Sequence, residues 1–435
     1  MSQRGSSNSV VLKSVFRPLG VGQLSLVEHS LCPLEARTSL TPNLVHAVQY
    51  HYTDAQRRRQ TANVRVFAPL GLSSGDEPYL WGLLALTLSQ PDSDGSLLAT
   101  PHWCLRQLGL IDSQTRRGGR QYQQFSAVLE RLSVVSYLSD ACYDPNQSEY
   151  RRVSFGFLSY SLPVDMHSCR AWRIVWNPVF FNLVKSMGGS MRFDLEKYRA
   201  LDPAARRLFL FLLKVGYRSV RLPVFDLKHL AVDLLGLSAT LAVRDMKVKV
   251  TRTLRRLEDA GVLLRWEIGR VSQGRYSVSL ERGENLTAAT ASVGFQPNAE
   301  QSPLIDGLLA IGFDQPSAVR LVRRFPTRLV AEWTDITQAA LERFGKDYFH
   351  KSPMAYLVDS LSKAAEGIRT PPDWWHAVRK AEQQEQEPSA ESRQLFSRLI
   401  EEVFGAERNV SVKPTAQPKT KRGLERAGDL LKTSF

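Results

Sequence analysis

The residue patterns that commonly carry catalysis are few in this sequence, and none of them forms a complete site. Asp92 and Asp94 could hold metal ions for phosphoryl transfer, but they fall in the segment QPDSDGS, where Asp and Ser are ordinary turn residues. Gly345-Lys346-Asp347 lacks the upstream glycine and the hydroxyl of a phosphate-binding loop. The eight histidines form no H-x-H or H-E-x-x-H pattern. We therefore expect a protein that is not an enzyme and that uses no metal or other cofactor.

Residues suited to binding a partner are more numerous than catalytic ones, above all in a basic helix expected at residues 241–260. One apolar stripe follows the helical period and is formed by Met246, Val250, Leu254 and Leu257. The acids are few, with Asp245 near the start and Glu258 and Asp259 at the end, so the basic side chains lack the interleaved partners of an ordinary solvated helix. We predict that this helix binds DNA in the major groove through Arg244, Lys247, Lys249, Thr251, Arg252, Arg255 and Arg256. The alternative is a helix that is merely basic.

A β-hairpin is expected directly after this helix. The strands LLRWEIG and RYSVSLE flank the turn VSQG. Arg270 and Arg275 near its tip suit contacts to the DNA backbone or the minor groove.

A second candidate site precedes the first in the chain. A helix expected at residues 121–132 has an apolar stripe of Phe125, Val128 or Leu129, and Leu132. Arginine can bind guanine and glutamine can bind adenine, so we predict DNA contacts from Arg116, Arg117, Arg120, Gln121, Gln123 and Gln124. A polar loop before an ordinary helix is the alternative. The hairpin that follows carries Asp144 and Glu149, which do not suit DNA, so its role is left open.

The two candidate sites occupy matching places in two similar segments. Each segment runs helix, helix, helix, strand, turn, strand, and landmarks such as Leu80 and Leu208 keep their register. That order is a helix-turn-helix followed by a hairpin, the winged-helix fold. The fold class expected is therefore mainly α with small hairpin wings (α+β), built from two tandem winged-helix domains and a C-terminal helical region.

The length of 435 residues also favours several domains. Composition and patterning predict, in chain order, a flexible N-terminal extension, two winged-helix domains, a linker, a helical domain and a largely disordered tail, at residues 1–60, 61–165, 166–284, 285–302, 303–381 and 382–435.

Charge and composition limit the partners and the compartment. The 57 Lys+Arg against 43 Asp+Glu give a formal charge of +14, which favours a nucleic-acid partner, here double-stranded DNA. Apolar runs are too short to cross a bilayer, the N-terminus lacks a signal-peptide pattern, and the four cysteines are scattered. We expect a cytoplasmic protein with reduced thiols, associated with nucleoid or plasmid DNA and not with a membrane.

Residues from about 61 to 282 resemble plasmid replication initiators of the replication initiator protein A family. The segments that carry the resemblance are FDLEKYRALDPAARRLFLFLLK and VKVTRTLRRLEDAGVL, in the places of the second domain's first helix and recognition helix. KSPMAYLVDSL looks like the C-terminal part of such proteins. The resemblance implies a bacterial protein that binds origin repeats, recruits the host replication initiator ATPase and replicative helicase, and represses its own promoter. It also implies a homodimer formed through the first winged helix.

A protein of another class fits the same motifs. A winged-helix transcriptional regulator would use the C-terminal helices for oligomerisation. Direct repeats beside an AT-rich stretch next to the gene would favour the initiator.

Overall fold

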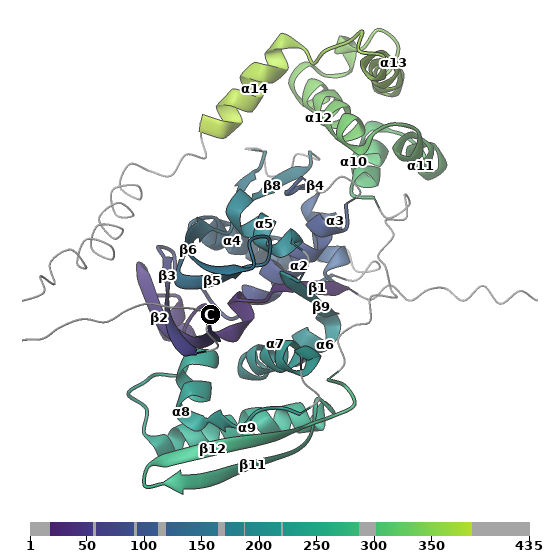
Figure 1. The fold of residues 1–435 in the computed structure, drawn as a ribbon. Coiled ribbons are helices and arrows are strands. Elements are labelled where there is room, and N and C mark those ends of the chain that lie inside the picture. Colours follow the sequence, from purple (N-terminus) through teal and green to yellow (C-terminus); the bar gives the residue numbers. More distant parts are fainter. Residues whose placement is uncertain are drawn as a thin grey trace, which may run out of the picture. The chain divides into compact units, whose positions relative to one another are not determined.

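The computed structural model describes residues 18–54, 58–90, 94–111, 119–163, 170–186, 188–218, 221–286 and 302–384. All of them belong to the compact unit Met1–Glu387, and the second unit, Pro388–Phe435, lies outside the described residues. Residues 287–301 of the linker predicted at 285–302 and residues 385–435 of the tail predicted at 382–435 also lie outside them. Helices and sheets are mixed, so the fold is α+β (Figure 1).

The N-terminal region is more ordered than its composition indicated. Residues 18–54 form strand β1 (Leu19–Gln23), turn η1 (Leu26–Glu28), helix α1 (Ala36–Ser39) and strand β2 (Leu44–Thr53). The prediction of a flexible extension at residues 1–60 is therefore wrong for this part. β1 pairs with β9 (Ser190–Asp194), a partner far along the chain that local composition cannot indicate.

The first set of three helices and a hairpin, the first helix–hairpin segment, runs from α2 to β6. Its helices are α2 (Glu77–Leu88), α3 (Pro101–Gln107) and α4 (Gly119–Ser133), and its hairpin is β5 (Ser136–Asp144) with β6 (Glu149–Gly156).

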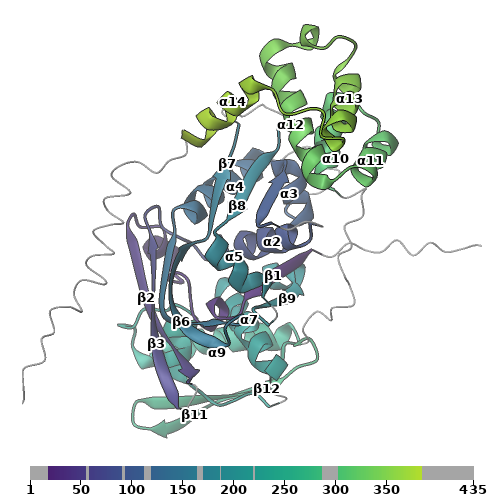
Figure 2. The ribbon, with the colours of Figure 1, turned by 45° about the horizontal axis from the view of Figure 1, so that its top comes forward.

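This segment carries more sheet than the predicted small wings. β2 and β3 (Arg59–Ala68) form a long antiparallel ribbon (Figure 2) that extends the hairpin into a sheet of order β2-β3-β5-β6. β4 (Ser96–Ala99), β8 (Trp172–Trp176) and β7 (Leu158–Ser161) form another sheet, and α5 (Pro178–Lys185) follows β8. The expectation of a mainly α protein thus underestimated the amount of β-sheet. Strands with one exposed face carry many polar residues, so their sequences resemble polar loops.

The second helix–hairpin segment, from α7 to β12, follows the short helix α6 (Leu195–Ala200). α7 (Pro203–Arg218) begins as predicted, with Pro203 at its first position and the Asp202 carboxylate accepting a 2.9 Å hydrogen bond from the Ala205 N–H. α8 (Leu227–His229) continues into the π-helical turn η2 (Leu230–Leu234), and α9 (Val243–Asp259) follows. The sheet has the order β10-β12-β11, with β10 (Phe225–Asp226), β11 (Leu263–Ser272) and β12 (Arg275–Arg282).

One continuous hydrophobic core contains side chains of both helix–hairpin segments. Leu83 of α2, Leu208 of α7 and Leu254 of α9 all belong to it and are completely buried. We predicted separate domains at residues 61–165 and 166–284, but these two ranges share one apolar interior.

The C-terminal helices have a core of their own. α10 (Leu304–Ile311), α11 (Gln315–Arg324), α12 (Thr327–Phe344), turn η4 (Lys346–Tyr348), α13 (Pro353–Ala365) and α14 (Asp373–Gln384) pack around Trp333, Leu357 and Trp375. Ser352 caps α13, since its hydroxyl accepts a 3.1 Å hydrogen bond from the Ala355 N–H. None of the helices in the described ranges is both long enough and apolar enough to cross a membrane.

Candidate nucleic-acid interface

The candidate site is built on α9, whose two faces differ sharply in chemistry. The predicted apolar stripe is confirmed, because Met246, Val250, Leu254 and Leu257 are all buried. The stripe packs α9 against α7, α8 and β11. Burial of this stripe fixes which side chains α9 presents outward.

The outward face of α9 is cationic. Its exposed side chains include Arg244, Lys249, Arg252, Arg255 and Arg256, and none of these forms an ion pair with a carboxylate of the described residues. Asp245, Glu258 and Asp259, the acids of α9, form no ion pair with these cations. Asp245 lies in the first turn, where the helix dipole favours a negative charge, and Glu258 accepts a 2.8 Å hydrogen bond from the Trp266 indole. The arrangement leaves several positive charges available to an anionic partner.

Two predicted contact residues, Lys247 and Thr251, are only half-exposed. The Lys247 ammonium nitrogen lies 5.0 Å from the centroid of the Tyr276 ring on β12. Lys247 therefore connects α9 to the hairpin, a role that the linear pattern did not indicate.

The β11–β12 hairpin extends beyond α9 and carries the remaining predicted residues of this segment. Arg270 and Arg275 are exposed near its tip, where Gly274 adopts a positive φ of 75° that glycine tolerates best. The Arg275 guanidinium lies 4.0 Å from the Asp226 carboxylate, with 74% of its side chain exposed, so this pair leaves it largely in solvent. Helix and hairpin thus present their cations together.

A cleft of about 620 Å³ adjoins the C-terminal half of α9. It is lined by Arg252 and Arg256 together with Lys197 of α6, Asp202 and Phe209. Sequence reasoning missed Lys197, because only tertiary packing brings α6 next to α9.

The predicted residues of the first helix–hairpin segment form a separate group on α4. Arg120, Gln123 and Gln124 are exposed and Gln121 is half-buried, whereas Arg116 and Arg117 lie outside the described residues. The buried stripe of α4 is Phe125, Val128, Leu129 and Leu132, as expected. Within the described residues, no hydrogen bond or ion pair joins the α4 group to the α9 group.

The two acids near the tip of this segment's hairpin both pair with Arg151. Asp144 accepts a 2.9 Å hydrogen bond from the Asn146 N–H and lies 3.8 Å from the Arg151 guanidinium. Glu149 lies 3.3 Å from the same guanidinium, so Arg151 offsets part of the acidic charge near this tip.

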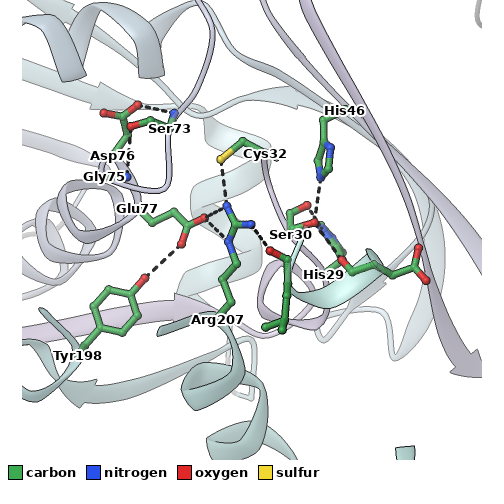
Figure 3. A network of polar contacts seen from close by, with 12 residues as sticks. His29, Ser30, Cys32, His46, Ser73, Gly75, Asp76, Glu77, Tyr198 and Arg207 are labelled. Carbon is green, nitrogen blue, oxygen red and sulfur yellow. Dashed lines mark hydrogen bonds and ion pairs between the residues drawn. The ribbon is translucent and has the colours of Figure 1, made fainter. Parts of the chain in front are cut away.

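A buried polar network holds α7, and through it α9, against the first helix–hairpin segment. Figure 3 shows Arg207 of α7 between Glu77 of α2 and Cys32, with Arg207 Nη2 lying 2.8 Å from Glu77 Oε1 and 3.0 Å from Cys32 Sγ. Arg207 also donates a 2.7 Å hydrogen bond to the Leu235 carbonyl. The guanidinium thereby gives each of these buried polar groups a hydrogen-bond or ion-pair partner within the hydrophobic core.

Two histidines and the thiol of this network are kept neutral by burial. Burial lowers the pKa of His29 to about 4 and that of His46 to about 3, and it raises the pKa of Cys32 to about 12. His29 Nε2 lies 2.9 Å from the Tyr137 hydroxyl and His46 Nε2 lies 2.9 Å from the Ser30 hydroxyl. These contacts are those of a structural interior rather than of an accessible reactive site.

Of the two aspartates considered for catalysis, the structure describes Asp94. Asp94 accepts hydrogen bonds from the Ser96 N–H at 2.9 Å and from its hydroxyl at 2.6 Å, whereas Asp92 lies outside the described residues. Among the described side chains, no group of three or more His, Cys, Asp or Glu residues could hold a metal ion.

Comparison with known proteins gives little to add to this geometry. No protein-family model and no curated protein matches the chain. A crystal structure of selenomethionine derivatives of domain 2 and domain 3 of RctB is similar, with a TM-score of 0.37 and 16% sequence identity over 56% of this chain and 94% of that chain.

Proposed function

We propose that this protein binds specific sites on double-stranded DNA, with α9 in the major groove and the β11–β12 hairpin on the adjacent backbone. One observation carries the proposal, namely that α9 buries one stripe completely while its opposite face exposes five cations that no described carboxylate pairs. An α-helix with its side chains is about 10–12 Å across, which fits the major groove about 12 Å wide, and arginine recognises guanine there through two hydrogen bonds.

We propose that the second helix–hairpin segment is a winged helix, and two features support this part of the proposal. Three helices precede a hairpin, and Lys247 packing on Tyr276 sets the hairpin beside α9. We propose the same fold for the first helix–hairpin segment. We propose a role in assembly for its hairpin, because the Arg151 side chain near the tip is engaged by Asp144 and Glu149.

We further propose that the DNA bound is a replication origin and that the protein initiates plasmid replication. The tandem order of the two segments supports this reading, together with the resemblance of FDLEKYRALDPAARRLFLFLLK and VKVTRTLRRLEDAGVL to plasmid initiators. Recruitment of a host initiator ATPase and helicase, repression of its own promoter and dimerisation through the first segment belong to the same proposal.

Methylation protection tests the DNA-binding part of the proposal. A duplex is first selected from a randomised library by the full-length protein, and dimethyl sulfate then probes guanine N7, an atom of the major groove. We expect protected guanines with the wild-type protein and none with the Arg244→Ala/Arg252→Ala/Arg255→Ala variant. Failure of the wild-type protein to enrich any duplex would contradict the proposal.

A replication assay tests the initiation part separately. The gene and its flanking DNA are placed on a plasmid that cannot otherwise replicate in the bacterial host. We expect stable maintenance, which the same triple variant should abolish. Specific DNA binding without maintenance would instead support a transcriptional regulator.

A further inference from the structure

One large apolar side chain interrupts the cationic face of α9. Val248 is 63% exposed. It precedes the buried Val250 by two residues, which at 3.6 residues per turn places it about 160° around the helix from that core residue. Val248 therefore lies near the centre of the outward face.

The neighbours of Val248 on this face are the residues proposed to bind DNA. Arg244 lies four positions before it and Arg252 four positions after it, so all three occupy one row along the helix. Thr251, three positions after it, is half-buried, and Asp245, three positions before it, is an exposed acid beside this row. An apolar group thus stands between two arginines where a DNA base edge would lie.

Folding gives no reason for valine at this position. A β-branched residue is a poorer helix former than the alanine or lysine that commonly occupies exposed helix positions. Its side chain contributes little to the core, since most of its surface faces solvent. The isopropyl group is therefore available for an intermolecular contact.

We propose that Val248 recognises a thymine in the bound DNA through the thymine 5-methyl group. The inference rests on the proposed function of α9. The thymine methyl is the one apolar group that the four standard bases present in the major groove, so it is the natural partner of an isopropyl group in that groove. Arg244 and Arg252 would supply the polar contacts on either side of it.

Replacing thymine by deoxyuridine removes only this methyl group and tests the contact directly. The probe is the duplex that the wild-type protein selects from a randomised library, with each thymine replaced in turn. We expect one replacement to weaken wild-type binding about fourfold, the effect of losing one buried methyl group. Val248→Ser should bind the thymine and deoxyuridine duplexes equally.

A matched control separates this contact from general surface effects. Val358 of α13 is 39% exposed and lies on a helix outside the proposed interface, so Val358→Ser should keep the wild-type sensitivity to deoxyuridine. Circular dichroism confirms that both variants are folded. Wild-type binding that is insensitive to every replacement, or a Val248→Ser variant that keeps the sensitivity, would overturn the inference while leaving the proposed function intact. If no duplex is selected, the proposed function fails and this inference falls with it.

Discussion

Arg207 of α7 and Glu77 of α2 form a buried ion pair, 2.8 Å between Nη2 and Oε1, that joins the two helix–hairpin segments. The side chains are 4% and 5% exposed. Removal of either partner leaves an uncompensated charge in an apolar interior, which is costly, whereas removal of both is often tolerated.

We predict that Glu77→Ala lowers the free energy of unfolding by about 3–5 kcal/mol. The Glu77→Leu/Arg207→Met double variant should recover much of that loss, because it buries no charge. Urea denaturation of the two variants and the wild-type protein measures both effects. Equal destabilisation by the single and the double variant would show that the ion pair is not the cause.

The neutral histidines of the same region predict a loss of stability in mild acid. The folded-state pKa values of His29 and His46, about 4 and about 3, lie below the ordinary value of 6.5, because burial disfavours the charged ring. The unfolded chain therefore binds protons below pH 6.5 that the folded chain does not bind until about pH 4 for His29. Above pH 6.5 the two histidines should not lower the free energy of unfolding. Below pH 6.5 that free energy should fall by about 1.4 kcal/mol per pH unit for each histidine.

Denaturation at pH 7 and pH 5 checks this dependence. His29→Gln should reduce the pH dependence, because it removes one of the two groups that bind protons in the unfolded chain first. A His29→Gln variant with the full wild-type pH dependence would contradict the assignment.

Several elements of the fold could be predicted from the sequence because local periodicity determines them. The stripe of Met246, Val250, Leu254 and Leu257 predicted α9, and Asp202 with Pro203 predicted the start of α7. The pairing of β1 with β9 could not be predicted, since it joins residues far apart in the chain. The β2–β3 ribbon was missed because its exposed faces make the sequence look like a polar extension.

The candidate site was predictable in its residue types and less so in its geometry. Exposure of Arg244 and Arg252 follows from the position of the buried stripe. Tertiary packing determines the contact of Lys247 with Tyr276 and the approach of Lys197 to α9. The periodicity of residues within one helix gives no information about such contacts.

Binding to DNA should depend strongly on salt. If the protein contacts six to ten phosphates, affinity should fall about 10³–10⁵-fold between 50 and 200 mM salt, because each contact releases condensed counterions. Fluorescence anisotropy with a labelled duplex over this range measures the slope. A flat response would mean that the positive charges of α9 and the hairpin do not face the phosphates.

Purified protein should neither nick supercoiled DNA nor hydrolyse ATP. Asp94 is engaged by the backbone and side chain of Ser96. Gel assays with Mg²⁺ or Mn²⁺ and phosphate release test this expectation. Metal-dependent cleavage that Asp94→Asn abolishes would assign a catalytic role to this turn.

The most direct test of the central claim compares Arg252→Ala with Arg323→Ala. Both variants remove one exposed arginine from a helix, the first on the outward face of α9 and the second on α11. Affinities for the selected duplex, for its single base-pair variants and for a scrambled duplex are measured at fixed salt. We predict that Arg252→Ala loses about 1–3 kcal/mol on the selected duplex and relaxes the preference at one base pair, while Arg323→Ala binds like the wild-type protein. A folded Arg252→Ala variant with wild-type affinity and preference would contradict the claim that α9 reads the DNA.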